Sequence, residues 1–140
     1  MIRVVLDTNV WLSGLLWGGI PRQVLGLREM RKIEIICSDE ILEEFSLILN
    51  RPKFQKRLNQ LGMNAEVILE MAREMCTFVV TEPLTVDNLR DPKDAIVIAA
   101  AIAGHCSVIV SGDEDVLVLE TVFGIEIVTP REFIDRGFFE

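Results

Sequence analysis

Short apolar runs rich in β-branched residues alternate along this chain with longer segments in which apolar residues recur at helical spacing. The short runs predict five strands, at residues 2–6, 33–37, 77–80, 107–111 and 125–128. The longer segments predict helices, at residues 10–17, 21–32, 39–50, 65–75, 92–103, 114–123 and 130–135. Apolar strands that alternate with helices are typical of a parallel sheet covered on both sides. We therefore expect a three-layer α/β/α fold with a central, mainly parallel five-stranded sheet.

Residues with strong positional preferences mark several element ends. Ser38 is a suitable N-cap for the helix that follows it. The helix at 92–103 is almost wholly apolar after its first turn, so we expect it to be buried. The longest predicted loop spans Pro83–Arg90. No repeat, linker or low-complexity tract divides the chain, so residues 1–140 should form a single domain.

Composition narrows the classes of function. The formal net charge is −8, and aromatic residues make up 6% of the chain, with no Tyr. This charge argues against tight passive binding to nucleic acid, and the few aromatics argue against stacking surfaces built from several rings. A nuclease remains compatible with the charge, because divalent ions held by carboxylates reverse the local sign.

The cysteines and the apolar stretches indicate a cellular compartment. Cys37, Cys76 and Cys106 are dispersed, which favours neither a disulfide framework nor a zinc site. Asp7 interrupts the first apolar run, so a signal-peptide pattern is missing, and residues 95–103 are too few to span a bilayer. We expect a cytoplasmic protein without a membrane segment.

Four acidic residues interrupt apolar segments. Asp7 and Asp113 each follow a predicted strand, Asp94 lies in the first turn of a buried helix, and Glu44 lies within another helix. Chemistry in open parallel sheets gathers at the carboxyl ends of the strands. At about 100° per residue, Glu44 shares the apolar face of its helix, whereas Glu43 points toward solvent. Only Glu44 of this pair can face the strand ends.

Each acid also has a structural interpretation. Asp7 could cap the next helix, Asp94 could accept from backbone amides, and Asp113 could organise a turn. Four acids at one sheet edge, however, would repel one another without cations. Oxygen ligands without thiolate or imidazole suit Mg²⁺ or Mn²⁺. His105, the single histidine, is better explained as a surface or packing residue than as a ligand.

Four short motifs resemble the PIN-domain family. They are Asp7-Thr8-Asn9-Val10, Glu44 followed by Arg51-Pro52-Lys53-Phe54, Asp91-Pro92-Lys93-Asp94, and Ser111-Gly112-Asp113-Glu114-Asp115. Each motif alone is weak, but their order and spacing, which cover essentially the whole chain, are specific. The chain is most similar to the VapC-like toxin ribonucleases of prokaryotic type II toxin-antitoxin modules.

This resemblance implies a metal-dependent endoribonuclease that cleaves RNA phosphodiester bonds with Mg²⁺ or Mn²⁺. It assigns the catalytic and metal-binding acids to Asp7, Glu44, Asp94 and Asp113, a further metal ligand to Asp115, and supporting polar roles to Thr8, Asn9 and Ser111. Ser111 stands where Thr is common in the family. The resemblance further implies a homodimer and inhibition by a cognate antitoxin protein.

Two surface features qualify this interpretation. Residues 45–65 contain no acid and carry four cations that could follow an RNA backbone, namely Arg51, Lys53, Lys56 and Arg57. A solvated helix face, or a surface for an acidic or hydrophobic partner, would explain them equally well. Apolar residues are also crowded at 11–17, between Trp11 and Trp17, where core packing is expected for most of them.

Two other functions remain open from sequence alone. Haloacid-dehalogenase-like phosphatases also place an Asp after a first parallel strand, but they need a second Asp two residues later, where this chain has Asn9. A nuclease-like interaction module without turnover would use the acids for stability. The intact set of four acids counts against that second alternative.

Overall fold

The computed structural model describes residues 1–84 and 92–139. The strands are β1 (Ile2–Leu6), β2 (Ile33–Cys37), β3 (Cys76–Phe78), β4 (Val108–Val110), β5 (Thr121–Val122) and β6 (Ile125–Val128). The helices are α1 (Thr8–Leu16), α2 (Gly19–Glu29), α3 (Asp39–Leu49), α4 (Pro52–Leu61), α5 (Ala65–Met75), α6 (Pro92–Ala103), α7 (Glu114–Leu117) and α8 (Pro130–Asp135). From residue 85 on, the predicted loop Pro83–Arg90 lies outside the described residues.

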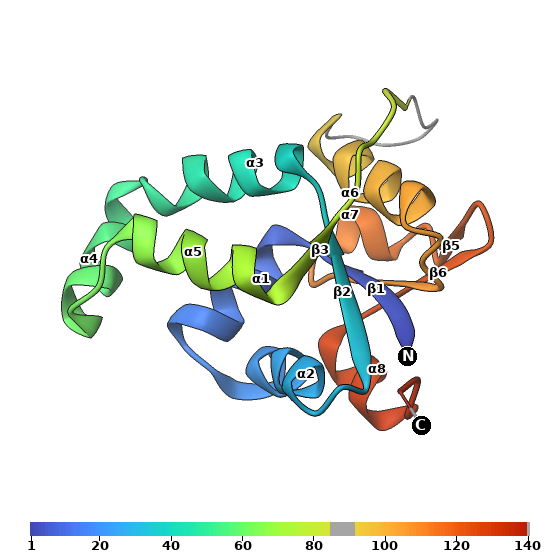
Figure 1. Cartoon of the computed structure of the whole chain (residues 1–140), viewed down its shortest axis with the longest axis horizontal. Coiled ribbons are helices and arrows are strands. Elements are labelled where there is room, and N and C mark those ends of the chain that lie inside the picture. Colours follow the sequence, from blue (N-terminus) through green and yellow to red (C-terminus); the bar gives the residue numbers. More distant parts are fainter. Residues whose placement is uncertain (85–91, 140) are drawn as a thin grey trace.

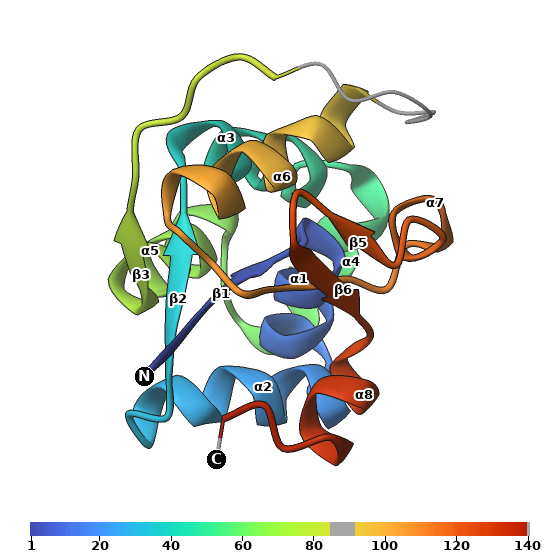
Figure 2. The ribbon, with the colours of Figure 1, turned by 90° about the vertical axis from the view of Figure 1, so that its right-hand side faces the viewer.

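The strands form one sheet in the order β3-β2-β1-β4-β6-β5. All neighbouring pairs are parallel except β5 and β6, which are antiparallel. Figure 1 shows α1, α2, α3 and α5 on one side of β2 and α6 and α7 on the other, and Figure 2 looks onto the side that carries α6. The three-layer α/β/α prediction is therefore confirmed, with six strands in place of the expected five.

The centre of the sheet is also the centre of the hydrophobic core. Val4, Val5 and Leu6 of β1 are completely buried, and β4 is buried along its whole length. The strand next to β1 in sequence, β2, lies on one side of it, and β4 lies on the other. The chain thus changes direction across the sheet between β1 and β4, which is where open α/β sheets bind ligands.

Several helix ends follow from single residues. Ser38 caps α3, because its hydroxyl accepts from the Ile41 amide at 3.2 Å. Pro52 opens α4, and Gly62 ends it in the left-handed conformation with φ of 67°. The basic segment between these two residues, to which the sequence analysis assigned no element, is therefore a helix. Figure 1 places α4 at the end of the molecule opposite β5.

The apolar helix α6 is buried as predicted. Val97, Ile98, Ala100 and Ala101 are all 2% exposed or less. Among the helices that the structure describes, none combines the length and apolarity needed to cross a bilayer.

The predicted helix 114–123 is wrong beyond its first turn. Helix α7 ends at Leu117, and Thr121 and Val122 form β5, which pairs with β6. Phe123 and Gly124 connect the two strands with φ of 49° and 78°, so both residues lie in the left-handed region that two-residue hairpin turns require. The antiparallel backbone pairing therefore overrides the helical pattern of the apolar residues.

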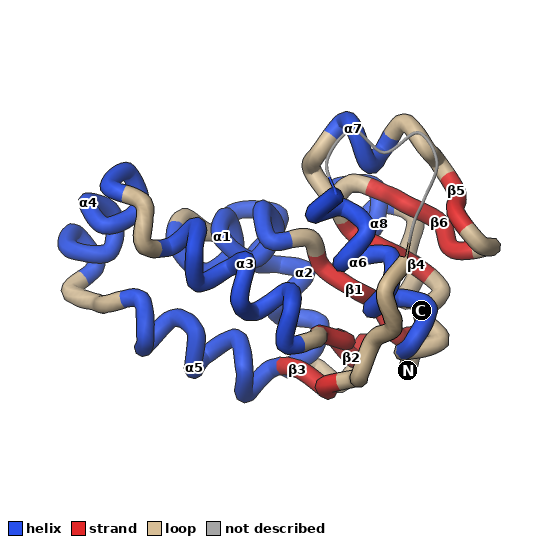
Figure 3. The backbone as a smooth tube through the Cα atoms, turned by 90° about the horizontal axis from the view of Figure 1, so that it is seen from above, coloured by secondary structure: helices blue, strands red, loops and turns tan. Residues whose placement is uncertain are grey.

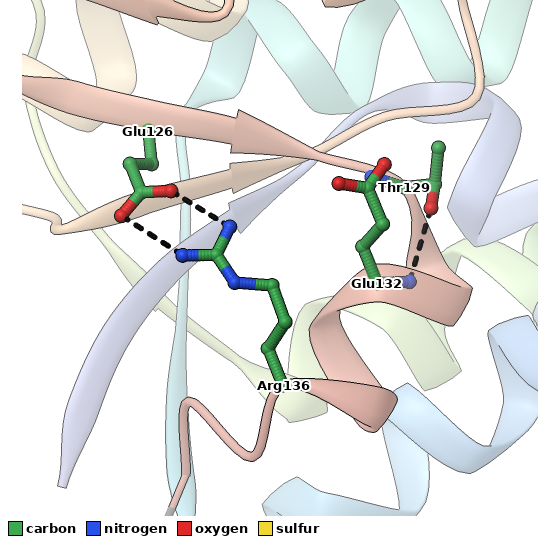
Figure 4. A network of polar contacts seen from close by, with 4 residues as sticks. All are labelled: Glu126, Thr129, Glu132 and Arg136. Carbon is green, nitrogen blue, oxygen red and sulfur yellow. Dashed lines mark hydrogen bonds and ion pairs between the residues drawn. The ribbon is translucent and has the colours of Figure 1, made fainter.

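The last helix is fastened to the sheet through two polar contacts (Figure 4). Arg136, the C-cap residue of α8, donates to both carboxylate oxygens of Glu126, at 2.9 and 3.4 Å. Thr129 and Glu132 form a reciprocal capping box at the start of α8. These contacts fix the end of β6, which hydrogen bonds to the segment that follows β4.

We predict that Phe123→Asn stabilises the protein. Phe123 is 64% exposed, so its replacement removes few packing contacts. Asn adopts the left-handed conformation at a lower cost than Phe, which should raise the free energy of unfolding by about 1 kcal/mol. Urea denaturation measures the change. A loss of stability would mean that the Phe123 ring contributes packing that its exposure does not indicate.

Candidate functional site

The two central strands end side by side. Leu6 of β1 pairs with Val110 of β4. One residue further along, the Asp7 amide donates to the Val110 carbonyl, and the Ser111 amide donates to the Val128 carbonyl, both at 2.9 Å. The sheet ladder thus extends past the strand ends, and it brings Asp7 and Ser111 together although they are 104 positions apart in sequence.

The carboxylate of Asp7 accepts two hydroxyl hydrogen bonds. Ser111 Oγ donates to Asp7 Oδ2 at 2.7 Å, and Thr8 Oγ1 donates to Asp7 Oδ1 at 3.3 Å. Asp7 occupies the N-cap position of α1, but its side chain makes no capping hydrogen bond. The capping interpretation of this residue is therefore wrong, and its oxygens face the neighbouring strand and Thr8.

Burial makes the charged form of Asp7 costly. Only 6% of the residue is exposed. Burial raises the pKa of its carboxyl above the ordinary value of 3.8, the hydrogen bonds from Ser111 and Thr8 lower it, and the negative charge of Asp113 raises it again. The ion pairs among the described residues do not include Asp7. A cation at this position would relieve both the desolvation and the repulsion.

Ser111 links Asp7 to Asp113. Its Oγ donates to Asp7 and accepts from the Asp113 amide at 3.0 Å. Asp113 Oδ1 in turn accepts from the Asp115 amide at 2.9 Å, which caps α7. The structural interpretation of Asp113 as a turn residue is thus correct for one oxygen. The same residue still lies close enough to Asp7 for its charge to affect the Asp7 carboxyl.

The two helical acids lie on elements that pack near this edge. Asp94, in the first turn of α6, is buried at 7% exposure. Glu44 is half-buried on α3, whereas Glu43 is exposed, as the helical spacing predicted. Helix α3 packs against both α1 and α6, and Figure 3 shows it between α1 and α5. Asp91 of the third motif lies outside the described residues.

The acids are suitable ligands for a hard divalent cation, but their positions do not provide a complete coordination shell. Their donors are carboxylate and hydroxyl oxygens, which Mg²⁺ and Mn²⁺ prefer. Within the described ranges 1–84 and 92–139, no three Asp, Glu, His or Cys side chains come close enough together to hold one ion. Asp7 and Asp113 thus form the core of the candidate site, and a cation held there would need water or further acids as ligands.

A groove of about 500 Å³, which we call the α1–α4 groove, opens beside these acids. It is lined at one end by Asn9 and Gly112, along α1 by Ser13, and at the other end by Trp17, Lys53 and Phe54. Asn9, expected to support the acids, is exposed on α1. Neither Ser13 nor Trp17 was predicted from the sequence as a site residue. The signal for them was the spacing of four between Asn9, Ser13 and Trp17, which places the three on one helix face.

The four cations of the basic segment have different surroundings. Arg51, Lys53 and Lys56 are exposed, and Lys53 lines the α1–α4 groove. Arg57 is half-buried, and its Nε donates to the Leu16 carbonyl at 2.9 Å. Arg57 thus helps to hold α4 against the end of α1.

Comparison with known proteins agrees with this architecture. Residues 3–115 match the PIN domain family. The chain is also similar to the uncharacterized protein MJ1680 of Methanocaldococcus jannaschii, with 31% identity over 145 residues that cover 96% of this chain and 91% of that protein. The matched region includes Asp7, Glu44, Asp94, Asp113 and Asp115. The match disfavours the phosphatase alternative.

We predict that Asp7→Asn stabilises the metal-free protein at neutral pH. Because the folded state raises the pKa of Asp7, ionising this carboxyl opposes folding, and the neutral amide removes that cost. The difference in melting temperature should shrink as the pH falls through the raised pKa of Asp7, and it should be smallest below the ordinary pKa of 3.8, where wild-type Asp7 is protonated both folded and unfolded. Thermal unfolding in EDTA from pH 7 to pH 3 measures it. A melting temperature of Asp7→Asn below that of the wild type at pH 7 would contradict the analysis.

We predict that Ser111→Ala destabilises the protein by about 1.5–3 kcal/mol at pH 7, because the buried Asp7 carboxylate loses a charged hydrogen bond. Ser107→Ala is the matched control, since Ser107 is exposed just before β4. Urea denaturation at pH 7 compares the two variants. Equal stabilities would show that the contact between Ser111 and Asp7 contributes nothing to folding.

Proposed function

Because this chain belongs to the PIN-domain family, a family of nucleases that commonly use divalent metal ions, we propose that it is a Mg²⁺- or Mn²⁺-dependent endoribonuclease. The reaction is hydrolysis of an RNA phosphodiester bond at the edge formed by Asp7 and Asp113. In the cell, the protein acts as the toxin of a toxin-antitoxin module.

The observation that best supports this proposal is the unfavourable environment of the Asp7 carboxylate. It is buried at the carboxyl end of the central strand, beside a second negative charge on Asp113. A purely structural residue at this position would gain stability by being neutral. A carboxylate kept there supports a role that needs its charge, and binding a divalent cation is such a role.

The residues divide into three roles. Asp7 and Asp113 would hold the ion, and Glu44, Asp94 and Asp115 would be further ligands, directly or through water. Ser111 and Thr8 orient the Asp7 carboxylate through their hydroxyl groups. When bound, the ion supplies an activated water and neutralises charge on the phosphate. No covalent intermediate with the protein is needed.

The biological role rests on the likeness of the motifs to VapC-like toxins. It includes action on cytoplasmic RNA, assembly as a homodimer and inhibition by a cognate antitoxin. Brief expression of the wild type in a bacterial host should arrest growth, and expression of Asp7→Asn should not. Mapping of new RNA ends in the arrested cells identifies the target. Growth arrest by both variants would show that toxicity does not depend on the nuclease site.

We predict that purified wild-type protein cleaves RNA with Mn²⁺ or Mg²⁺ and is inactive in EDTA. Asp7→Asn and Asp113→Asn should abolish cleavage, because each removes a charge from the core of the site. Glu44→Gln should lower the cleavage rate about 10- to 100-fold, as is common when the surroundings of a metal are changed. Gel analysis of a labelled RNA measures all rates.

Glu43→Gln is the matched control for Glu44→Gln, since it makes the same change one position away on the exposed side of α3. It should cleave at the wild-type rate. Equal rates for the two variants would show that Glu44 does not contribute to the site. Metal-independent cleavage, or full activity of Asp7→Asn, would overturn the proposed function.

A further inference from the structure

The α1–α4 groove connects the acids to the basic helix. At one end it is lined by Asn9 and Gly112, which are sequence neighbours of Thr8 and of both Ser111 and Asp113. At the other end it reaches Lys53 of α4. A strand bound with its phosphate at the acids would therefore have an open path toward the cations of α4.

One face of α1 forms the wall of this path. Asn9, Ser13 and Trp17 follow one another at intervals of four residues, so they lie in a row on the helix. At 1.5 Å per residue, the row extends about 12 Å from the acid edge. The wall is polar near the acids and aromatic at its far end, as expected for contacts to a sugar-phosphate near the acids and to a base further away.

The Trp17 ring is exposed but held in place. Trp17, the C-cap residue of α1, is 52% exposed, whereas Trp11 within α1 is 1% exposed and stacks on Phe45. The Arg57 guanidinium lies 5.5 Å from the centre of the Trp17 ring, and the Phe54 ring meets it edge-on at 6.0 Å.

The hydrogen bond from Arg57 to the Leu16 carbonyl fixes the guanidinium against Trp17. Little further conformational entropy would be lost when a ligand stacks on a ring held in this way.

A lysine lies beside the neighbouring Phe54 ring. Lys53 is exposed, lines the groove, and its Nζ lies 5.1 Å from the centre of the Phe54 ring. An aromatic ring beside a lysine is the pair of groups that proteins use to bind single-stranded nucleic acid, with a base on the ring and a phosphate on the cation. Among the described residues, the groove holds one such pair, which suits recognition of one nucleotide near the cleaved bond.

We propose that the α1–α4 groove is a base-binding subsite for single-stranded RNA, in which an unpaired base stacks on Trp17 and Lys53 contacts the adjoining phosphate. This inference rests on the proposed function, and it adds the two residues that bind a nucleotide beside the cleaved bond. Bases in a duplex already stack on their neighbours and cannot offer a face to Trp17. The subsite therefore accepts a base only where that base is unpaired.

Binding is tested without cleavage. Every protein carries Asp7→Asn, EDTA is present, and fluorescence anisotropy follows a labelled single-stranded RNA. Adding Trp17→Leu, which keeps an apolar side chain but removes the aromatic face, should weaken binding about tenfold. Adding Lys53→Ala should weaken binding and reduce its dependence on salt. A duplex of the same sequence should bind more weakly than the single strand.

The chain offers matched controls for both substitutions. Phe78 on β3 is also an exposed aromatic residue with a guanidinium nearby, since Arg73 lies 6.0 Å from the centre of its ring. Lys32 is an exposed lysine between α2 and β2. Phe78→Leu and Lys32→Ala should bind the RNA as the parent does, and melting temperatures verify that every variant is folded.

Intrinsic fluorescence gives a second readout. Trp11 is buried, so RNA should quench mainly the emission of Trp17, and Trp17→Phe should remove the quenching while Phe78→Leu keeps it. If Trp17→Leu binds as tightly as Phe78→Leu, or the duplex as tightly as the single strand, the subsite is overturned, while metal-dependent cleavage by the wild type still supports the nuclease. If Trp17→Leu loses binding but the wild type cleaves no RNA, the subsite stands and the proposed function fails.

Discussion

The pairing of β1 with β4 is the constraint on which the rest of the site depends. It places Leu6 opposite Val110, and the next residues, Asp7 and Ser111, inherit that register. The resulting hydrogen bond of 2.7 Å orients a carboxylate that the core would otherwise exclude. Because Ser111 also accepts from the Asp113 amide, one hydroxyl positions the acids of two different strand ends. The sheet supplies this geometry at no additional cost, since the same ladder holds the hydrophobic core together.

Helix α1 connects the acids to the basic helix α4 and fixes the position of one relative to the other. Its first residue, Thr8, donates to Asp7, and its last turn is closed by arginines from other elements. Arg22 donates to the Gly14 carbonyl at 2.9 Å, and Arg57 donates to the Leu16 carbonyl at the same distance. These carbonyls would lack partners at a helix end, so the arginines satisfy the backbone and fix α2 and α4 around α1. The position of the basic helix relative to the acids is therefore determined by the backbone of α1.

The sequence predicts this fold where local and long-range preferences agree. Helices α5 and α8 match their predicted bounds, because Asn64 and Thr129 cap amphipathic segments. The prediction fails at residues 118–123, where β5 exists only because β6 lies beside it. Convergence of Asp7 and Asp113 could be predicted, since both follow parallel strands. The exposure of Trp17 could not, because it depends on how α4 packs against the end of α1, and the spacing of apolar residues on α1 does not encode that packing.

The overall charge of −8 and the proposed RNA substrate are compatible because the charges are segregated. Residues 45–65 contain four cations and no acid, and α4 brings one of them, Lys53, to the groove that starts at the acids. On the proposed function, a strand entering this groove would meet positive charge at one end, while at the other end Asp7 and Asp113 would repel it until a divalent ion is bound. The proposed RNA binding would therefore need no net positive charge, and binding of the ion and of the strand should reinforce each other, since the ion removes the repulsion between the acids and the phosphates.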